Sequence, residues 1–398
     1  MKLVNEMLDT LPKEVWKNKD LKWLDPAAGM GNFPVAVYMR LMEGLKDVIK
    51  DEEKRRIWIL EKMLYMVELD NTNVFMMKKI FCGKKYKLNI FNCSFLDYKN
   101  DIIFDIIVGN PPYQNTDESG KRKAKSNNLW SEFIKISFDN FLKDKGYLLF
   151  ITPYSWMTAG FGYKDIFYKN YIIYLNIKEC EKYFNVGSSF SYYLIKKTPN
   201  KKSTKVKCLY NKKEYNSNDI YIKDDTDFLP ILLSKESLSI IYKFYNNKLE
   251  KIIFEKAGDL DSGNSKKKKL IGKCNDIFIH PIRHTTSNKN LCSSVKHILA
   301  DKKKILMNKP SELEPIFDNG KLGFTENQFY YLTNNEKYVD VLNSKLYRFI
   351  FSICKWSGFN SHLILKNIPY IDNFTSDEDI YRLFKLTKDE IKLIKDNT

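Results

Sequence analysis

Two short motifs in this 398-residue sequence carry side chains suited to chemistry. The first runs Asp25-Pro26-Ala27-Ala28-Gly29-Met30-Gly31-Asn32-Phe33, an acid followed by a glycine-rich turn. Such a turn at the start of a helix lets a ligand approach bare backbone N–H groups. A dinucleotide fingerprint would need a glycine where Pro34 stands and an acid about 20 residues later, whereas the next strand-end acid is Glu68. The spacing therefore favours a ligand with an ammonium group for Asp25 and ribose hydroxyls for Glu68.

The second motif is Asn110-Pro111-Pro112-Tyr113, which follows the apolar run Ile106-Ile107-Val108. Two prolines hold the backbone in an extended turn and remove two N–H donors, so carbonyl oxygens and the Asn110 side chain are left pointing outward. A rigid acceptor cluster beside an aromatic ring suits the binding of a planar amino group, with Tyr113 stacked on the attached ring. The motif therefore predicts chemistry on an amino group of an aromatic or amide substrate.

Alternating strands and helices must position these motifs. Apolar periodicity predicts strands at 21–24, 63–67, 87–91, 104–108 and 147–151, and helices at 33–49, 73–80 and 129–142. Short apolar strands separated by helices indicate an α/β fold with a mostly parallel sheet covered on both faces. Ligands bind at the carboxyl ends of the strands in such sheets, where both motifs lie.

The pattern changes after Thr198, where short β-like pieces and a helix over 232–245 lead to a polar stretch and a lysine run. We place a domain boundary near 200, giving domains 1–198 and 199–398, the second of mixed α+β type. Ser376 with Asp379 and Thr387 with Glu390 have capping-box spacing, which predicts a helical tail.

The positive charge is concentrated in one segment. Residues 1–200 carry 31 basic and 24 acidic side chains, residues 201–310 carry 24 and 12, and residues 311–398 carry 11 and 13. A basic block is the expected footprint of a polyanion binder, although lysine runs are also common on solvated faces. The seven scattered cysteines form no C-x-x-C pair and are interpreted as reduced core thiols, and no metal site is predicted.

The two motifs together resemble the adenine-N6 DNA methyltransferases that use S-adenosylmethionine (AdoMet). Asp25 to Phe33 is similar to the family's cofactor motif, with Asp25, Ala27, Gly29, Gly31 and Phe33 at its positions, and Asn110 to Tyr113 is similar to its N-P-P-Y catalytic motif. The order of cofactor motif, catalytic motif and recognition region resembles the gamma class of type II restriction-modification enzymes. The resemblance implies a Rossmann-like catalytic domain at 1–198 and a target recognition domain at 199–398.

The resemblance also implies roles for residues outside the two motifs. Glu68 falls at the ribose-binding acid, and Ser94-Phe95 falls at a D-F pair that contacts the adenine of the cofactor, with Asn92 as a neighbouring candidate. Phe184 falls where a second aromatic contacts the flipped base, although a core packing role is an alternative. The family's chemistry implies that the Asn110 side chain and the Pro111 carbonyl accept the two hydrogens of the adenine amino group, and the resemblance also places Asn110 among the cofactor-binding residues. Because that nitrogen is hidden in a duplex, base flipping is implied.

Basic segments are candidate DNA contacts. Lys121, Arg122, Lys123 and Lys125 closely follow the catalytic motif and are expected to grip DNA. Lys266, Lys267, Lys268 and Lys269 form a second run that suits phosphates as well as a solvated loop.

Two alternatives remain at this point. N-P-P-Y also occurs in enzymes that methylate a glutamine amide of release factors, and a silent DNA-binding specificity subunit would keep the fold. We expect double-stranded DNA as the partner, a monomer, and a methyltransferase without a fused nuclease, which leaves room for a separate restriction endonuclease. Acidic Glu6 and Asp9 interrupt the N-terminal apolar residues, so we expect no export signal, no membrane span and a cytoplasmic protein in a bacterial, phage or viral-factory setting.

Overall fold

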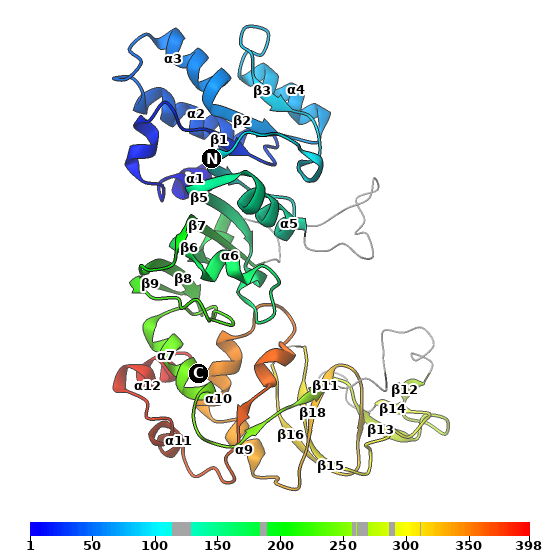
Figure 1. Ribbon diagram of the computed structural model, residues 1–398. Coiled ribbons are helices and arrows are strands. Elements are labelled where there is room, and N and C mark those ends of the chain that lie inside the picture. Colours follow the sequence, from blue (N-terminus) through cyan, green and yellow to red (C-terminus); the bar gives the residue numbers. More distant parts are fainter. Residues whose placement is uncertain (114–128, 184–188, 257–259, 261–269, 286–290, 311) are drawn as a thin grey trace. The chain divides into compact units, whose positions relative to one another are not determined.

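The computed structural model describes residues 1–398 except 114–128, 184–188, 257–259, 261–269, 286–290 and 311. The chain divides into two compact units, each described by itself (Figure 1). The first unit comprises Met1–Trp156 and Phe161–Thr226, and the second comprises Met157–Gly160 and Asp227–Thr398.

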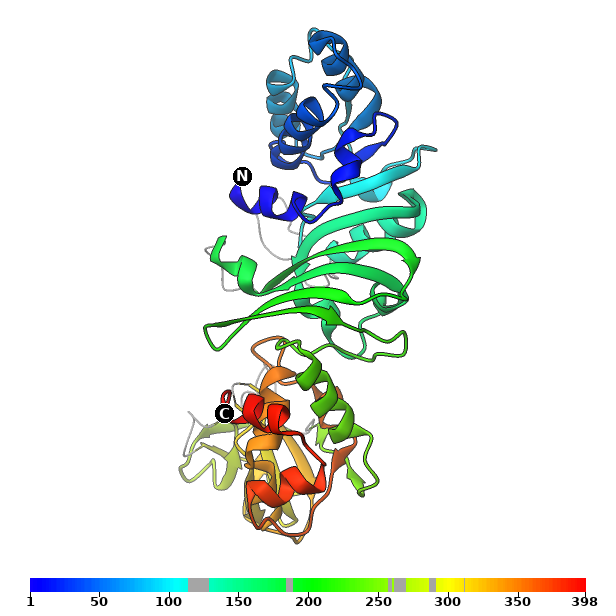
Figure 2. The same cartoon turned by 90° about the vertical axis from the view of Figure 1, so that its left-hand side faces the viewer.

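A nine-stranded twisted sheet forms the centre of the first unit, in the order β3-β2-β1-β4-β5-β7-β6-β8-β9 (Figure 2). The strands from β3 to β5 are mutually parallel, β7 is antiparallel to both β5 and β6, and β8 is parallel to β6 and antiparallel to β9. The bounds are β1 Trp23–Asp25, β2 Leu64–Val67, β3 Asn89–Phe91, β4 Phe104–Gly109, β5 Leu142–Pro153, β6 Asn170–Ile177, β7 Phe190–Pro199, β8 Thr204–Tyr210 and β9 Lys213–Ile220.

Helices cover both faces of this sheet, because alternate strand residues point to opposite sides. One core joins α1 (Lys2–Leu8), α2 (Asn32–Gly44) and α4 (Asn71–Ile80) to apolar residues of β1, β2, β4, β5 and β7. On the other face, rings of α5 (Leu129–Ile136) and of the turn after it pack against Phe95 and Phe104. The remaining helices of this unit are α3 (Glu52–Trp58) and α6 (Lys164–Tyr168). The predicted α/β fold with a mostly parallel sheet is confirmed.

The boundary between the units lies later than predicted. The first unit extends to Thr226 rather than ending at 198. The reason is that β8 pairs in parallel with β6 and β9 completes a hairpin with β8, so both strands extend the main sheet. The alternating polar residues of β8 and β9 do not indicate which sheet these strands join.

In the part of the second unit that the structure describes, the strands form three small sheets. Their strand orders are β11-β18-β15-β16, β12-β14-β13-β17 and β10-β19. The bounds are β10 Lys251–Ile252, β11 Glu255–Lys256, β12 Ile271–Lys273, β13 His280–Arg283, β14 Leu291–Ser293, β15 Lys303–Asn308, β16 Ile316–Asn319, β17 Gly323–Phe324, β18 Gln328–Leu332 and β19 Ile368–Pro369.

Helices complete the second unit: α7 (Lys235–Tyr245), α9 (Tyr338–Leu342), α10 (Lys345–Ile353), α11 (Asp377–Leu383) and α12 (Lys388–Lys395). The predicted helical tail is confirmed, since Ser376 and Thr387 cap α11 and α12 through their side-chain oxygens. The ring of Phe244 in α7 packs against Tyr347 of α10, with ring centroids 4.9 Å apart. These contacts give the second unit its own core, which mixes helices and strands as predicted.

Two of the seven cysteines correct the sequence interpretation. Cys274 and Cys292 form a disulfide with their Cα atoms 4.9 Å apart, whereas all cysteines were expected to be reduced. The sequence offers no sign of this pairing because 17 residues separate the two positions and only the strand pairing of β12 with β14 brings them together. Among the described residues, no helix is both long enough and apolar enough to span a bilayer.

Candidate active site

The carboxyl ends of three neighbouring strands form the candidate site. In the sheet, β2, β1 and β4 are adjacent and parallel, so Asp25 at the end of β1, Glu68 after β2 and Asn110 after β4 lie along the same edge. The strand order reverses between β1 and β4, and such a reversal is where open α/β sheets bind ligands. The two motifs found in the sequence, with 76 residues between them, are therefore neighbours in the fold.

The glycine-rich turn is shaped by two left-handed residues. Gly29 has φ +54° and Gly31 has φ +91°, a region that other residues rarely adopt. A Cβ at Gly31 would approach Met77 of α4 at 3.2 Å, whereas a Cβ at Gly29 would meet no atom within 4 Å. Gly31 therefore permits close helix packing, while Gly29 leaves an open approach to the backbone.

Glu68 closes over this turn. Its Oε2 accepts a 2.7 Å hydrogen bond from the Gly29 N–H, and its Oε1 accepts one of 2.8 Å from the Asp70 N–H. The Nδ2 of Asn73 also donates to Oε1, at 3.4 Å, whereas Oε2 keeps a second lone pair that can accept from a hydroxyl of a bound ribose. The Nδ2 of Asn92 holds the same segment by donating to the carbonyls of Glu68 and Leu69 at 3.0 Å.

Asp25 is a buried acid, with 2% of its surface exposed. Its Oδ1 accepts from the Ala27 N–H at 3.1 Å. Burial, with a smaller contribution from the nearby Glu68 charge, raises the pKa of Asp25 to about 8. Among the described residues, neither Asp25 nor Glu68 forms an ion pair with a lysine or arginine. Two close carboxylates without a cation suit a ligand that brings its own positive charge.

Four of the residues predicted to bind the cofactor have side chains or N–H groups that are already used within the protein. Phe33 is 6% exposed and belongs to the core under α2. The Ser94 hydroxyl caps a turn by accepting from the Leu96 N–H at 3.2 Å. Phe95 is 2% exposed, with its ring centroid 5.1 Å from that of Phe133, so its ring is not available to stack on a ligand. The Ala27 N–H is used by Asp25, as described above.

Two exposed apolar side chains near the turn were missed by sequence reasoning. Leu69 directly follows Glu68 and is 69% exposed, and Met30 lies between the two glycines and is 62% exposed. An apolar residue immediately after a strand-end acid is the signal that could have identified Leu69. Both suit contact with the flat face of a bound base.

The catalytic motif begins where β4 ends. A Cβ at Gly109 would lie 2.9 Å from the Oδ1 of Asp25, so this glycine lets the acid and the motif approach each other closely. Asn110 is exposed and Pro111 is buried. The Tyr113 hydroxyl donates a 2.5 Å hydrogen bond to the Oδ1 of Asn110. Burial raises the pKa of Tyr113 above its usual value, which keeps this hydroxyl protonated as a donor.

The aromatic partner of Tyr113 is Phe190, at the start of β7. Their ring centroids are 5.1 Å apart with an interplanar angle of 38°. Phe190 is 1% exposed, and its N–H donates to Glu181 at 3.1 Å. No sequence motif pointed to Phe190, because the pairing arises only from β7 lying beside β5. The predicted second aromatic, Phe184, lies outside the described residues.

The predicted DNA contacts cannot be placed in this site. Lys121, Arg122, Lys123 and Lys125 lie outside the described residues, as do Lys266, Lys267, Lys268 and Lys269.

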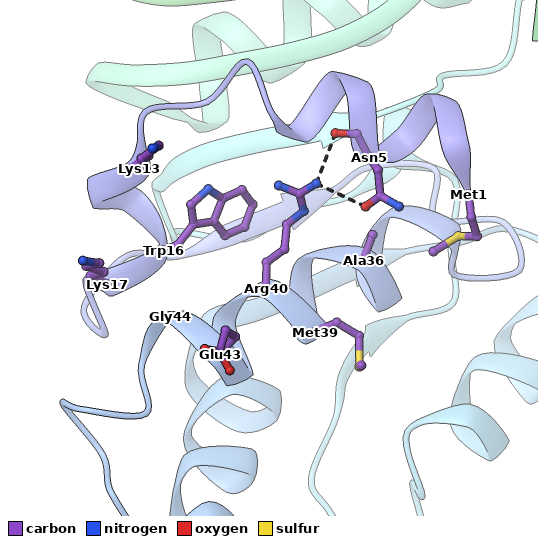
Figure 3. A pocket seen from close by; sticks show the side chains of 10 residues that line it. All are labelled: Met1, Asn5, Lys13, Trp16, Lys17, Ala36, Met39, Arg40, Glu43 and Gly44. Atoms are coloured by element: carbon purple, nitrogen blue, oxygen red, sulfur yellow. Dashed lines mark hydrogen bonds between the residues drawn. The ribbon is translucent and has the colours of Figure 1, made fainter.

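A separate hollow of about 520 Å³ lies on the outer side of α2 (Figure 3). Its wall includes Trp16 and Arg40, whose guanidinium group lies over the Trp16 ring and donates to Asn5 at 3.2 Å. It reaches Gly44 at the far end of α2, whereas the glycine turn lies at the start of that helix. This hollow is therefore distinct from the candidate active site.

Comparison with known proteins agrees with this geometry. Residues 46–184 match the family model of the Eco57I restriction-modification methylases. The chain is 25% identical to an uncharacterized adenine-specific methylase of Mycoplasma pneumoniae, with 46% of this chain and 61% of that protein covered. It is 39% identical to the modification methylase CviBIII of Paramecium bursaria Chlorella virus NC1A over 22% of this chain and 23% of that protein. The predicted resemblance to adenine-specific DNA methyltransferases is confirmed.

Solved structures extend the likeness over both units. The type IIL restriction-modification enzyme MmeI in complex with DNA has a TM-score of 0.52 at 12% identity, covering 92% of this chain and 64% of that one. The type ISP enzyme LlaBIII bound to DNA has a TM-score of 0.51 at 12% identity, covering 93% and 38%. At these identities the likeness concerns the fold alone. The chain spans less than two thirds of the length of each of these relatives.

Proposed function

We propose that this protein transfers a methyl group from AdoMet to the N6 amino group of adenine in duplex DNA. One observation carries the proposal: Gly109, the residue before the Asn110–Tyr113 motif, passes so close to Asp25 that a Cβ added to it would lie 2.9 Å from the Asp25 Oδ1. The acceptor cluster for an amino group is thereby adjacent to a cleft suited to a cationic ligand.

The cleft fits AdoMet. Asp25 would hold the ammonium group, Glu68 the ribose hydroxyls, and Leu69 the face of the adenine, while Gly29 leaves room for the ligand to approach. Phe95 would contribute through its backbone, because its ring is buried. When bound, AdoMet supplies an electrophilic methyl group on a sulfonium.

The catalytic loop would prepare the nucleophile. The adenine nitrogen is a poor nucleophile because its lone pair is delocalised into the ring. The Asn110 Oδ1 and the Pro111 carbonyl would accept its two hydrogens, which favours a tetrahedral nitrogen whose lone pair faces the methyl group. Tyr113, supported from behind by Phe190, would stack on the flipped base. Positioning of this kind contributes much of the rate, and the motif supplies no general base.

The test is transfer of labelled methyl from AdoMet to unmodified AT-rich duplex DNA, digested to nucleosides. We expect label in N6-methyladenine, lost in Asn110→Ala and retained in Asn216→Ala, a control at an exposed asparagine of β9. AdoMet binding by Asn110→Ala, measured by calorimetry, establishes that this variant is folded. Label on a release factor but not on DNA would point instead to the protein-methylating alternative. Cofactor binding without transfer to either would point to a silent specificity subunit.

We further propose that the second unit recognises the target sequence and that the chain acts as a monomer beside a separate restriction endonuclease. Residues 227–310, which belong to this unit, carry 17 basic and 8 acidic side chains, and this basic excess supports DNA contact. Light scattering coupled to size exclusion, with and without duplex DNA, tests the monomer.

A further inference from the structure

We propose that the loop 274–279 of the second unit enters a groove of duplex DNA and presses Ile277 and Ile279 against base edges. The inference rests on the proposed function, since it takes DNA as the ligand, and it assigns the contact to one loop.

The loop is anchored at several points. Cys274 is bonded to Cys292 in the middle of β14. The Oδ1 of Asn275 accepts from the N–H groups of Ile277 and Phe278 at 2.9 and 2.8 Å, and the Asn275 N–H donates to the Phe278 carbonyl at 3.1 Å. The Phe278 ring lies over Gly272, where a Cβ would be only 2.7 Å away.

The path of the loop follows from the strand register. Lys273 at the end of β12 pairs with Leu291, whereas His280 at the start of β13 pairs with Ser293. The loop therefore runs back along β14 from one end of that strand to the other. Its conformation is fixed by the disulfide, the Asn275 turn and the Phe278 ring, so its exposed side chains are displayed in a defined position.

Those exposed side chains are apolar. Ile277 is 69% exposed and Ile279 is 59% exposed, although the same loop buries Phe278 more deeply. His280 pairs with Ser293, the last residue of β14, so Ile279 lies at that end of the sheet. Val295 follows the same end of β14 and is 44% exposed. Single exposed apolar residues are common, so we take these three, around one small sheet, as the apolar part of the proposed contact.

Charge identifies DNA as the occupant. Exposed Lys273 directly precedes the loop and has no ion-pair partner among the described residues. Lys296 follows Val295 at the other end, where it forms an exposed ion pair with Asp301 at 2.6 Å, a weak surface pair that a phosphate can replace. Cations on both sides of an apolar stretch fit phosphates on both sides of a base edge. Asp276 lies beside Ile277, and a carboxylate can accept from the cytosine amino group just as an isoleucine can contact the thymine methyl.

The test uses a double variant that carries both Ile277→Ala and Ile279→Ala. Its control is Leu383→Ala, on α11 of the same unit, where the side chain is 46% exposed. Apolar base contacts of this kind predict a rise of about tenfold or more in the Kd for duplex DNA, by fluorescence anisotropy, and in the KM for DNA in methyl transfer. The Kd for AdoMet and the melting temperature should match those of the control.

A photo-crosslinking residue at position 277 gives an independent readout, with crosslinks to DNA expected there and not at position 383. DNA affinity within twofold of the control and no crosslink at 277 would overturn the inference. So would a change of oligomeric state in the double variant with DNA affinity unchanged, since the loop would then bind protein. Anisotropy reports DNA binding even if no methyl transfer occurs, so failure of the proposed function and failure of this inference are distinguishable.

Discussion

The raised pKa of Asp25 predicts that cofactor binding depends on pH in a specific way. The carboxyl has a pKa of about 8 in the free protein because it is buried beside Glu68. To hold an ammonium group it must be ionised, so below pH 8 binding of AdoMet has to release a proton. An ordinary α-amino group has a pKa of about 7.8, so above that value the ligand loses the charge that Asp25 would bind.

The magnitude follows from these two values. The product of the fraction of Asp25 ionised and the fraction of ligand protonated rises about 20-fold from pH 6 to pH 8 and declines again above pH 8. The free energy of unfolding changes in the opposite direction to AdoMet affinity below pH 8, because it falls as the pH rises. Because the folded pKa lies above the unfolded value of 3.8, the stabilisation from the extra proton is present at low pH and is lost as the pH rises through 8.

The assay is calorimetric titration with AdoMet from pH 6 to pH 9 in two buffers of different ionisation enthalpy. The native protein should bind most tightly near pH 8 and release close to one proton at pH 6.5. Asp25→Asn should bind more weakly at pH 8, show no rise between pH 6 and pH 7.5, and unfold at higher temperature than the native protein at pH 9. An affinity for AdoMet that is flat from pH 6 to pH 8 in the native protein would refute this account of Asp25.

Three further predictions concern the catalytic loop and the second unit. Tyr113→Phe keeps the stacking ring but removes the hydroxyl that fixes the catalytic asparagine, and losing one hydrogen bond of about 1 kcal/mol predicts a fall in kcat of roughly fivefold, with the AdoMet Kd unchanged. Gly109→Ala places a methyl group 2.9 Å from the Oδ1 of Asp25, so single-turnover methyl transfer should slow by up to about 100-fold while urea denaturation shows a folded protein. Lys304→Met leaves the carboxylate partner of a fully buried ion pair unpaired, which should cost about 3–5 kcal/mol in the free energy of unfolding by urea denaturation, and normal stability would contradict the assigned pairing.

The elements around the two motifs could be predicted from the sequence because their apolar patterns are local. The strand at 64–67 and the helix that begins at Asn71 were expected within about two residues of where they lie. The meeting of Asp25 with the Asn110 motif also followed from general rules for parallel sheets. These predictions succeeded because strand direction alone decides which ends share an edge.

The rest of the site depends on contacts between distant segments. Phe190 contacts Tyr113 only because β7 lies between β5 and β6 and is antiparallel to both. No local sequence pattern predicts this strand order. The burial of the Phe95 ring likewise depends on α5, which packs over it from a later part of the chain. The Cys274–Cys292 disulfide arises from the pairing of β12 with β14. In each case tertiary pairing, rather than the residue or its immediate neighbours, decides the role.

The adjacency of β1 and β4 has an evolutionary consequence. The chemistry needs the end of β1 beside the end of β4, but nothing in that contact depends on which strand is synthesised first. A gene rearranged so that the catalytic strand precedes the cofactor strand would encode the same active site, provided the sheet order is kept. Circular permutation would therefore leave the candidate active site intact in a protein with this sheet.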